Sequence, residues 1–477
     1  MLESCKYSIT IVCYYIKNYP NHLLCIVFWT SEAAMEAILE LRSLLIPMQL
    51  INSIFHVDMR NKDDRNAIFL VAEIFFASIM GAAGAFNAAF AVRLGASNSQ
   101  IGLLSSIPAL LALIVSIPAG RFLQKKIHRK PWLISSLTIS RVGMLMVALS
   151  PFVHAGSFQG LLVVAILIIM STPASFFNVG FIPMLADVIP EQNRSSVFTA
   201  RNIIAGATTS IFVFLFGQWL SRVTFPVNYQ IMFAIGWAIS MLSFYFLSKV
   251  QVPDATPVVE GAKGRPSLKA QWLTLLQAFS NEPAFMRITR NTILLSIGLW
   301  IASPLYIIFF VRSLSASDAW IGLQSTTANI ATIFGYALSR WILVRWGEPR
   351  TLKRAALTLG MYPILVGLFP NLTLIIFASA LNSFFSSGFN LSQFNQLILA
   401  MPEEKRPEYT ALYYTTTNMG AFIFPLIGVS LASLVGIGPT LIGCGFLSLL
   451  GGASFWFSPV ITSTKTAGNL AIKRTLS

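Results

Sequence analysis

Only 11% of the 477 residues are charged while 55% are hydrophobic, and the mean hydropathy is +0.70. Because soluble domains usually carry about 25% charged residues, this composition excludes an ordinary string of soluble domains and indicates a membrane protein that crosses the bilayer several times. The net charge of +15 would suit a nucleic-acid partner in a soluble protein, but in a membrane protein it is typical of cytoplasmic loops rich in Lys and Arg.

We expect residues 1–58 to form an N-terminal extension that does not span the membrane and is either amphipathic or disordered. Their apolar run from Tyr7 to Ile16 is too short to span a bilayer, and no signal-peptide pattern accompanies it. Glutamates spaced four apart between residues 32 and 40 stand opposite apolar side chains, which indicates a short surface helix. A poorly ordered segment is the alternative, and we assign no function to this part of the chain.

From about residue 67 onward, apolar runs of roughly 20 residues follow one another, each long enough to cross a hydrocarbon layer of ~30 Å. They predict twelve membrane-spanning helices, at about 67–92, 100–120, 131–153, 158–185, 197–221 and 228–248, and then at about 288–311, 319–340, 351–369, 371–400, 409–434 and 439–460. The expected domains are an N-terminal six-helix bundle over 59–249, a cytoplasmic linker with a surface helix over 250–285, a C-terminal six-helix bundle over 286–460 and a cytoplasmic tail over 461–477. The predicted fold class is therefore an all-α membrane protein.

The cations fall almost entirely on one side of these spans. With the N-terminus inside, the inner segments hold 26 Lys and Arg residues, whereas the outer loops hold 3, namely Arg93, Arg222 and Arg312. Because cytoplasmic loops of membrane proteins are enriched in Lys and Arg, we expect both termini in the cytoplasm and the protein in the inner or plasma membrane of the cell. The basic run from Arg121 to Lys130 is then a cytoplasmic loop, and nucleic acid is not expected as a partner.

The two halves of the chain are related by an internal repeat. A shift of 220 pairs residues 101–103 with residues 321–323, and the basic Lys125 with Arg345. A shift of 212 gives eight identities in the 24 positions from residue 171, where composition alone would give about two. Both copies lead into a basic loop on the same side, so the repeat is parallel and its axis lies along the membrane normal.

These features resemble the major facilitator superfamily of secondary transporters over roughly residues 60–460. The resemblance rests on the paired basic loops, on PEQNR at 190–194 and PEEKR at 402–406, and on the helix starts SNSQIGLL at 97–104 and SDAWIGLQ at 317–324. It implies two six-helix halves that rock about a central pathway, with charged cytoplasmic loops as gates. The gate-loop residues that it indicates are Gly120, Lys125, Arg129, Lys130, Asp187, Glu191, Arg194, Arg345, Gly347, Glu403 and Arg406.

The loop signature departs from the family pattern at its acidic position, where Gln124 stands in the first copy and Val344 in the second. In the family this carboxylate helps to lock the two halves together on the cytoplasmic side. The departure puts that lock in doubt, and Asp187 and Glu191 on the same side are the candidates to replace it.

Polar stripes on the predicted helices indicate where a solute would pass. The tenth helix carries four amide or hydroxyl side chains spaced by four, four and three residues, hence on one face, and the fourth carries three in a similar pattern. The resemblance implies that helices 1, 4, 7 and 10 line the pathway. The candidates are Asn87, Ser171, Ser175, Asn178, Trp300, Ser303, Tyr306, Asn382, Ser386, Asn390 and Gln393. The alternative is that such residues hold helices together by close packing and hydrogen bonds.

Two charged residues fall inside predicted spans, Glu73 in the first and Arg141 in the third. A charge at mid-membrane costs roughly 2.5–3.5 kcal/mol on insertion scales, so each should find a partner. Their depths differ by only about 6 Å at a rise of about 1.5 Å per residue, which predicts a Glu73–Arg141 pair. One interpretation makes Glu73 a carboxylate that couples transport to protons, and the other, which we favour, is a static salt bridge.

The sequence contains no HExxH, P-loop or GxSxG motif, and its four histidines are scattered. We therefore expect no enzyme activity, no cofactor and no metal site. The expected function is secondary active transport of a small neutral or amphipathic organic solute by a monomer, with the proton as candidate coupling ion and export favoured over uptake. The alternatives are a sensor or scaffold that kept the fold and lost transport, and a transporter of lipid.

Overall fold

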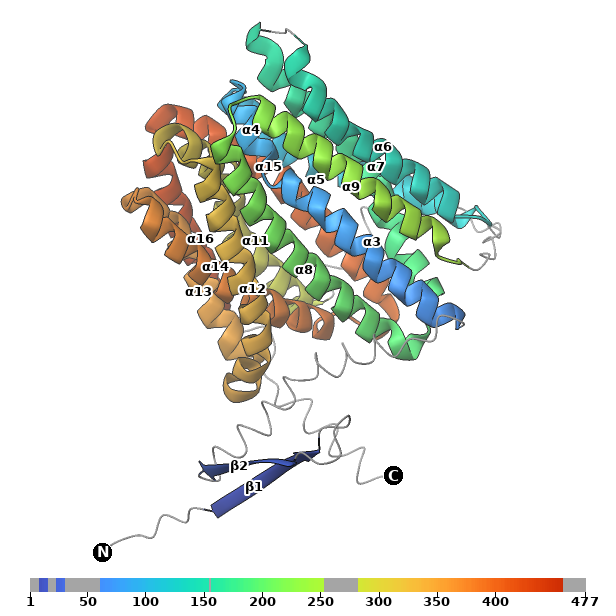
Figure 1. Ribbon diagram of the computed structural model, residues 1–477. Coiled ribbons are helices and arrows are strands. Elements are labelled where there is room, and N and C mark those ends of the chain that lie inside the picture. Colours follow the sequence, from blue (N-terminus) through green and yellow to red (C-terminus); the bar gives the residue numbers. More distant parts are fainter. Residues whose placement is uncertain (1–7, 16–22, 31–60, 154–155, 253–281, 458–477) are drawn as a thin grey trace, which may run out of the picture. The chain divides into compact units, whose positions relative to one another are not determined.

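The computed structural model describes residues 8–15, 23–30, 61–153, 156–252 and 282–457 (Figure 1). Its contacts divide the chain into two units, residues 1–60 and residues 61–477. Three predicted segments lie outside the described residues. They are the surface helix between residues 32 and 40, the surface helix of the linker, and the C-terminal tail.

In the first unit, β1 (Ser8–Tyr15) and β2 (Leu23–Thr30) pair as an antiparallel hairpin, with Ser8 opposite Thr30 and Tyr15 opposite Leu23. Both segments are rich in β-branched and aromatic residues, which favour extended backbone. The sequence analysis predicted no strand here, because it compared the apolar run only with the length of a membrane span.

The first half of the second unit contains seven described helices. They are α3 (Lys62–Gly84), α4 (Asn87–Arg93), α5 (Asn98–Gln124), α6 (Lys130–Leu149), α7 (Gln159–Val188), α8 (Glu191–Arg222) and α9 (Val227–Lys249). Only Ala85 and Phe86 separate α3 from α4, and the two together form one span from Lys62 to Arg93. Short 3₁₀ turns at Ser150–Phe152 and Gly156–Phe158 lie between α6 and α7.

The second half contains six described helices. They are α11 (Pro283–Ile308), α12 (Asp318–Trp346), α13 (Glu348–Leu368), α14 (Leu372–Leu399), α15 (Arg406–Val435) and α16 (Ile437–Phe457). A π-helical turn, Phe309–Ser313, continues α11, and a 3₁₀ turn, Glu403–Lys405, precedes α15.

The helices lie where the sequence predicts the spans. Among the described residues, ten helical segments are long and apolar enough to cross a membrane, and they include neither α12 nor α13. α12 carries a polar run between Gln324 and Thr332, and the first two turns of α13 hold four charged residues, which lowers the hydropathy of both helices.

The helix starts that carry the repeat are built alike. Ser97 caps α5: its hydroxyl accepts a hydrogen bond from the Gln100 backbone N–H at 3.2 Å, and the Gln100 side chain accepts one from the Ser97 N–H at 2.9 Å. Ser317 caps α12 by accepting from the Trp320 N–H at 3.2 Å. Serine is a favoured N-cap because its oxygen satisfies a backbone donor that has no helical partner. The repeated SNSQ and SDAW segments therefore begin helices at equivalent positions.

Most helices pack within their own half. For example, α3 contacts α8 and α9, while α11 contacts α15 and α16. The main contacts between the halves are α8 with α12, which run side by side in Figure 1, and α5 with α15. Under the predicted repeat α5 corresponds to α12 and α8 to α15, so each contact maps onto the other.

Small residues permit these contacts between the halves. A Cβ added at Gly217 of α8 would lie 2.9 Å from the Asp318 carbonyl oxygen and 3.0 Å from the Gly322 Cα atom. A Cβ added at Gly102 of α5 would lie 2.9 Å from a side-chain methyl of Val429 in α15. Gly102 and Gly322 are partners in the repeat, so both halves use the same position for close approach.

Candidate functional site

Two asparagines are exposed within long apolar helices, Asn178 in α7 and Asn390 in α14. Each stands nine residues from a strongly exposed apolar side chain, Ile169 (61% exposed) and Leu381 (58%). Nine residues are about two and a half helical turns, so each asparagine lies on the opposite face of its helix from that side chain, and it shares its own face with an exposed apolar residue one turn on, Ile182 or Phe394. Polar groups in spanning helices are expected on the interior side, and the two asparagines are repeat partners.

The other candidates in α14 divide into accessible and packed residues. The Asn390 amide lies 3.5 Å from the half-buried Ser386 hydroxyl, and Asn382 is also half-buried. Gln393 is buried and donates to the Tyr413 hydroxyl of α15 at 2.8 Å. Within the stripe that the sequence predicts, Asn390 is therefore accessible. Gln393 instead joins α14 to α15.

The remaining candidates of the first, fourth and seventh spans are less exposed than Asn178 and Asn390, with the exception of Ser303. Asn87 is half-buried, and its side-chain oxygen has no hydrogen-bond partner among the described residues. Ser171 donates to the Ile168 carbonyl at 2.6 Å and Ser175 is half-buried. The exposed Ser303 donates to the Trp300 carbonyl at 2.9 Å.

The aromatic candidates of α11 lie in stacks with other rings of the second half. The Trp300 ring is 6.1 Å from that of Phe424, and the Tyr306 ring is 5.1 Å from that of Tyr362. These ring contacts agree with the alternative that the aromatic candidates hold helices together. Among the described residues, Ser303 is then the exposed polar candidate of this helix.

A network of buried charges lies inside the first half. Glu73 of α3 forms its ion pair with Arg201 of α8, whose Nη2 lies 2.9 Å from Oε2 of the carboxylate. The Ser243 hydroxyl donates to Oε1 of Glu73 at 3.2 Å and accepts from Nη2 of Arg141 at 2.7 Å. Arg141 and Arg201 each also donate to a backbone carbonyl, that of Ser240 and that of Leu70. Glu73 and Arg141 are thus connected through a serine.

Arg201 is the network residue that the sequence analysis missed, because it counted this arginine among the inner-loop cations. The structure places it eleven residues into α8, 6% exposed, with its guanidinium carbon 5.0 Å from the centre of the Phe181 ring. Its position after the PEQNR turn was the available signal, since a helix that begins at residue 191 carries residue 201 almost three turns inward.

A salt bridge joins the halves at the predicted outer end of the bundle. Arg93, the last residue of α4, donates to the carboxylate of Asp318 at 2.9 Å and to the Ala316 carbonyl at 3.0 Å. The Tyr229 hydroxyl of α9 donates to the same carboxylate oxygen at 2.6 Å. Asp318 is nearly buried, so this carboxylate of the second half is held by two donors of the first.

A second arginine makes the reciprocal contact. Arg312, at the end of the span formed by α11, donates to the Asn98 side chain and to the Ala96 carbonyl of the first half. Under the shift of 220, Ala96 corresponds to Ala316 and Asn98 to Asp318. Each half thus holds the other's helix start with an arginine from the end of its own first span. We call these two contacts the outer clasp.

A cavity of about 460 Å³ lies at the outer clasp, lined by Arg93, Arg312 and Asp318 together with residues such as Leu220 and Asn228. About two helical turns along α12 from Asp318, the Thr326 hydroxyl donates to the Ser210 carbonyl of α8 at 3.1 Å. The outer halves of α8 and α12 are therefore joined by a hydrogen bond as well as by close contact at their glycines.

The apolar core differs between the two ends of the bundle. At the outer end, one buried cluster around Phe90 and Phe233 of the first half also contains Ile308 and Ile321 of the second. At the inner end, the cluster around Leu133 and Leu185 contains described residues of the first half only, and a separate one around Phe389 contains those of the second half only. The outer ends thus share one core, beside which a further cluster around Phe310 and Val366 contains described residues of the second half only.

The sequence profile of the Major Facilitator Superfamily matches residues 68–299 and, as a second copy, residues 288–474. The chain belongs to the major facilitator superfamily. No curated protein matches the sequence. The predicted resemblance is confirmed, and the family profile matches as two copies, one in each half of the chain.

Solved structures of other superfamily transporters share the fold. A bacterial homologue of the human lysosomal transporter Spinster, inward-facing and unoccupied, has a TM-score of 0.60 at 13% identity over 83% of this chain and 98% of its own. The nucleoside transporter NupG has 0.58 at 12%, over 83% and 100%. The xylose transporter XylE from E. coli, inward open, has 0.59 at 11%, over 83% and 95%. At such identities the likeness establishes the fold and leaves the solute open.

The gate loops of this superfamily member are tied to helices of their own half. Nη1 of Arg129 lies 3.7 Å from Oδ2 of Asp187 at the end of α7, and Lys130 donates to the carbonyls of Ser248 and Val250 after α9. Arg194 donates to the Ala186 carbonyl at 2.8 Å. The first basic loop is therefore anchored within the first half.

In the second half, Glu403 pairs with Arg406 at 3.2 Å in the turn before α15. Arg345 is exposed over the Trp341 ring, and Gly347 between α12 and α13 has a φ of +78°, which glycine adopts easily. Glu348, which the sequence analysis did not single out, accepts from Asn395 at 2.8 Å and from Gln396 at 3.1 Å, and so ties this loop to α14.

Three gate-loop candidates remain, namely Gly120, Lys125 and Glu191. Gly120 is half-buried and Lys125 is exposed, whereas the side chain of Glu191 lies outside the described residues. The proposal that Asp187 replaces the missing loop carboxylate thus rests on its contact with Arg129, whereas the same proposal for Glu191 falls on a side chain outside the described residues.

Proposed function

We propose that this superfamily member is a secondary active transporter that moves a small neutral or amphipathic organic solute across the cell membrane by alternating access. The observation that carries the proposal is the contact between the two halves at the predicted outer end of the bundle. The outer clasp and a shared core join the halves at the predicted outer end, while the described anchors of the gate loops stay within one half. Halves joined at one end can rock about that contact.

The chemistry of the exposed polar groups supports an uncharged solute. Asn178, Ser303 and Asn390 offer amides and a hydroxyl on helices that the superfamily places at the pathway. Among the described residues of the first half, the buried guanidiniums of Arg141 and Arg201 donate to protein acceptors, and the buried carboxylate of Glu73 is paired. A phosphate or dicarboxylate would instead favour a cation that is open to the pathway.

Export is our preferred direction and the proton our candidate coupling ion. The ion pair with Arg201 and the hydrogen bond from Ser243 favour a structural role for Glu73, because together they join α3 to α8 and α9 inside one half. A proton would then have to bind elsewhere, and a pH gradient imposed on vesicles tests this directly: acceleration of flux that survives Glu73→Gln would assign the coupling site to another group.

The proposal is tested by a thermal-shift screen of the purified protein, followed by flux measurements in proteoliposomes with each stabilising compound. We expect saturable flux that falls at least tenfold in Asn390→Ala and in Asn178→Ala. Leu381→Ala, nine residues from Asn390 on the opposite face of α14, is the matched control and should keep the flux. A compound that binds without crossing would indicate the sensor alternative, and transfer of labelled phospholipid between leaflets would indicate the lipid alternative.

A further inference from the structure

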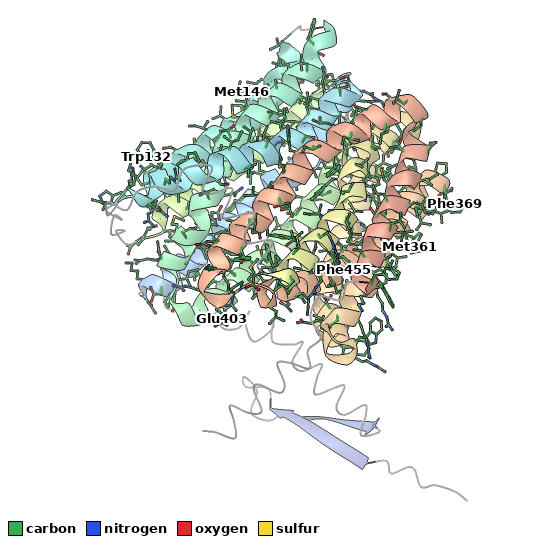
Figure 2. The ribbon with its side chains drawn as sticks, turned by 180° about the vertical axis from the view of Figure 1, so that it is seen from behind. Trp132, Met146, Met361, Phe369, Glu403 and Phe455 are labelled. Atoms are coloured by element: carbon green, nitrogen blue, oxygen red, sulfur yellow. The ribbon has the colours of Figure 1, made fainter. Side chains whose placement is uncertain are left out.

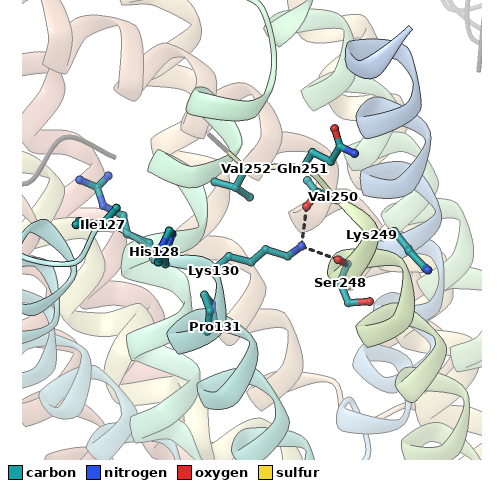
Figure 3. Close-up of a pocket in the computed structure, with 10 residues that line it drawn as sticks. Ile127, His128, Lys130, Pro131, Ser248, Lys249, Val250, Gln251 and Val252 are labelled. Carbon is teal, nitrogen blue, oxygen red and sulfur yellow. Dashed lines mark hydrogen bonds between the residues drawn. The ribbon is translucent and has the colours of Figure 1, made fainter. Parts of the chain in front are cut away.

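A pocket of about 530 Å³ lies at the predicted inner end of the first half, between the α5–α6 loop and the end of α9 (Figure 3). Its lining includes His128, Arg129 and Lys130 from the loop and Lys249 from α9. The transport pathway proposed above runs along α7, α11 and α14, so this pocket belongs to a different part of the fold.

The lining carries an excess of positive charge. Three of the ten lining residues are Lys or Arg and none is Asp or Glu. The Lys130 ammonium crosses the pocket and donates to the Ser248 carbonyl at 2.5 Å and to the Val250 carbonyl at 2.7 Å, as Figure 3 shows. Carbonyl oxygens orient this ammonium but do not neutralise it.

The other two cations keep most of their charge available. Arg129 has a carboxylate near it, but the contact with Asp187 is long at 3.7 Å and Asp187 is 46% exposed. Lys249 is exposed, with its Nζ 5.3 Å from the centre of the Tyr245 ring. An anion in the pocket would therefore meet Arg129 and Lys130, and it would be joined by Lys249 when that side chain, which points away from Lys130 in Figure 3, turns from the Tyr245 ring toward the pocket.

Exposed aromatic rings place the pocket at the level of the lipid headgroups. Trp132, two residues into α6, is 45% exposed, and Tyr245, one turn before the end of α9, is 53% exposed. Each ring lies beneath a lysine, Lys126 over Trp132 at 5.3 Å and Lys249 over Tyr245. Tryptophan and tyrosine concentrate at the interface between membrane and water, and lysines beside them reach toward the polar headgroups.

Apolar faces lead from the pocket along both helices. In α6, exposed Ile139, Val142 and Met146 follow Trp132 on one side of the helix, and Figure 2 labels the two ends of this row. In α9, exposed Leu242 and Ile235 continue from Tyr245 in the same way. A molecule with a charged head in the pocket would find an apolar surface for its chains directly beside it.

We propose that this pocket binds the phosphate headgroup of an anionic phospholipid of the inner leaflet, with Lys130 and Lys249 as its principal cationic contacts. The lipid would join the α5–α6 loop to the end of α9 through its headgroup, and its acyl chains would cover the exposed side of α6 and α9. Basic pockets between spanning helices on the cytoplasmic side are suited to such headgroups because the anionic leaflet supplies the ligand at high local concentration.

The test uses the full-length protein in neutral detergent, titrated with dioleoylphosphatidylglycerol and with dioleoylphosphatidylcholine. Bound lipid is counted by native mass spectrometry, and thermal unfolding is followed in parallel. We expect phosphatidylglycerol to bind more tightly and to raise the melting temperature. Lys249→Gln should weaken its binding about fivefold, since a cation near the membrane surface contributes about that factor, and Lys130→Gln at least as much.

Lys353→Gln in α13 is the matched control, because Lys353 also lies over an aromatic ring, that of Trp456 at 5.6 Å, in the other half. It should leave the affinity unchanged. If Lys130→Gln fails to fold, the exposed Lys249 still provides the test. Three results would overturn the proposal: equal binding of both lipids, equal weakening by Lys249→Gln and Lys353→Gln, or protection by inorganic phosphate or glycerol phosphate at the same concentration as the lipid. The last would assign the pocket to a soluble phosphate.

Discussion

The two ends of the helical bundle are built on different principles. At the predicted outer end, buried and nearly buried groups of both halves interlock: Asp318 receives Arg93 and Tyr229, and Ile308 and Ile321 enter the core of the first half. At the predicted inner end, each half has its own apolar cluster and its loops are anchored within that half. The contrast teaches that the contact between halves is concentrated where charge and apolar burial act together.

The outer clasp also follows the internal repeat closely. The inner loops follow it only loosely. Arg93 and Arg312 grip equivalent positions of the opposite half, so a rotation about the repeat axis exchanges the two contacts. Their partners are unequal, since Asp318 is charged and its counterpart Asn98 is neutral. The two arms of the clasp should therefore differ in strength, and substitutions can separate them.

The largest effect is expected from the network inside one half. Glu73→Ala leaves Arg141 and Arg201 buried without their carboxylate, and an uncompensated buried charge typically costs about 3–5 kcal/mol. Thermal unfolding in detergent should show a large fall in melting temperature. Adding Arg201→Ala should recover part of the loss, because one of the two stranded cations is then removed. A stable Glu73→Ala single variant would contradict the network as a source of stability within the half.

The next effect tests the strong arm of the clasp. Asp318→Ala removes the acceptor of Arg93 and Tyr229, and hydrogen bonds to a charged group are worth about 1.5–3 kcal/mol. In a background without the native cysteines, maleimide labelling of Ile321→Cys should rise by roughly 10- to 100-fold, since each factor of ten corresponds to about 1.4 kcal/mol. Ile321 lies in the shared outer core and is only 4% exposed.

Leu185→Cys provides the control for opening against unfolding. Leu185 is fully buried in the inner cluster of the first half, so it should stay protected when the outer end opens and become labelled only if the half itself unfolds. Equal labelling of both probes in Asp318→Ala would mean that the carboxylate stabilises the fold generally and does not act between the halves.

A smaller effect is expected from the second arm. Arg312→Gln removes donors to Asn98 and Ala96, but Arg312 is exposed and both acceptors are neutral, so we expect about 1 kcal/mol. Labelling of Ile321→Cys should increase roughly fivefold. Combined with Arg93→Gln, the two effects should add to within about 0.5 kcal/mol if the arms act independently on one opening step. No change in labelling with Arg312→Gln would reduce the clasp to a single arm.

The sequence was sufficient for the fold because its strongest signals are physical requirements of the bilayer. Apolar runs of span length, the uneven distribution of cations and the repeated helix starts at 97–104 and 317–324 predicted the helices and their family. It was less informative about pairing. Glu73 was expected beside Arg141 from depth alone, but depth does not state which helices face each other, and Arg201 of α8 occupies the nearer place.

The candidate site shows the same division. Spacing put Gln393 and Asn390 on one face of α14, but that face borders both α15 and the accessible side, so one amide is buried against Tyr413 and the other is exposed. The outer clasp, in contrast, was within reach of the sequence. The shift of 220 already aligned Asn98 with Asp318, and Arg93 and Arg312 were two of only three outer cations. The sequence therefore already contained both arginines of the clasp and the two equivalent positions that they bind.

The smallest effect is expected at the inner end, and it sharpens the contrast most directly. Arg129→Gln breaks a pair that is long, half-exposed and confined to one half, so its loss should cost less than about 0.5 kcal/mol. Labelling of Ile321→Cys should change less than twofold, against the large change expected for Asp318→Ala. A fall in labelling below the parent would mean that Arg129 also holds the second half when the outer end is open, because removing that contact would favour outer closure. The inner loop would then be a gate in its own right, engaged in the opposite state of the cycle.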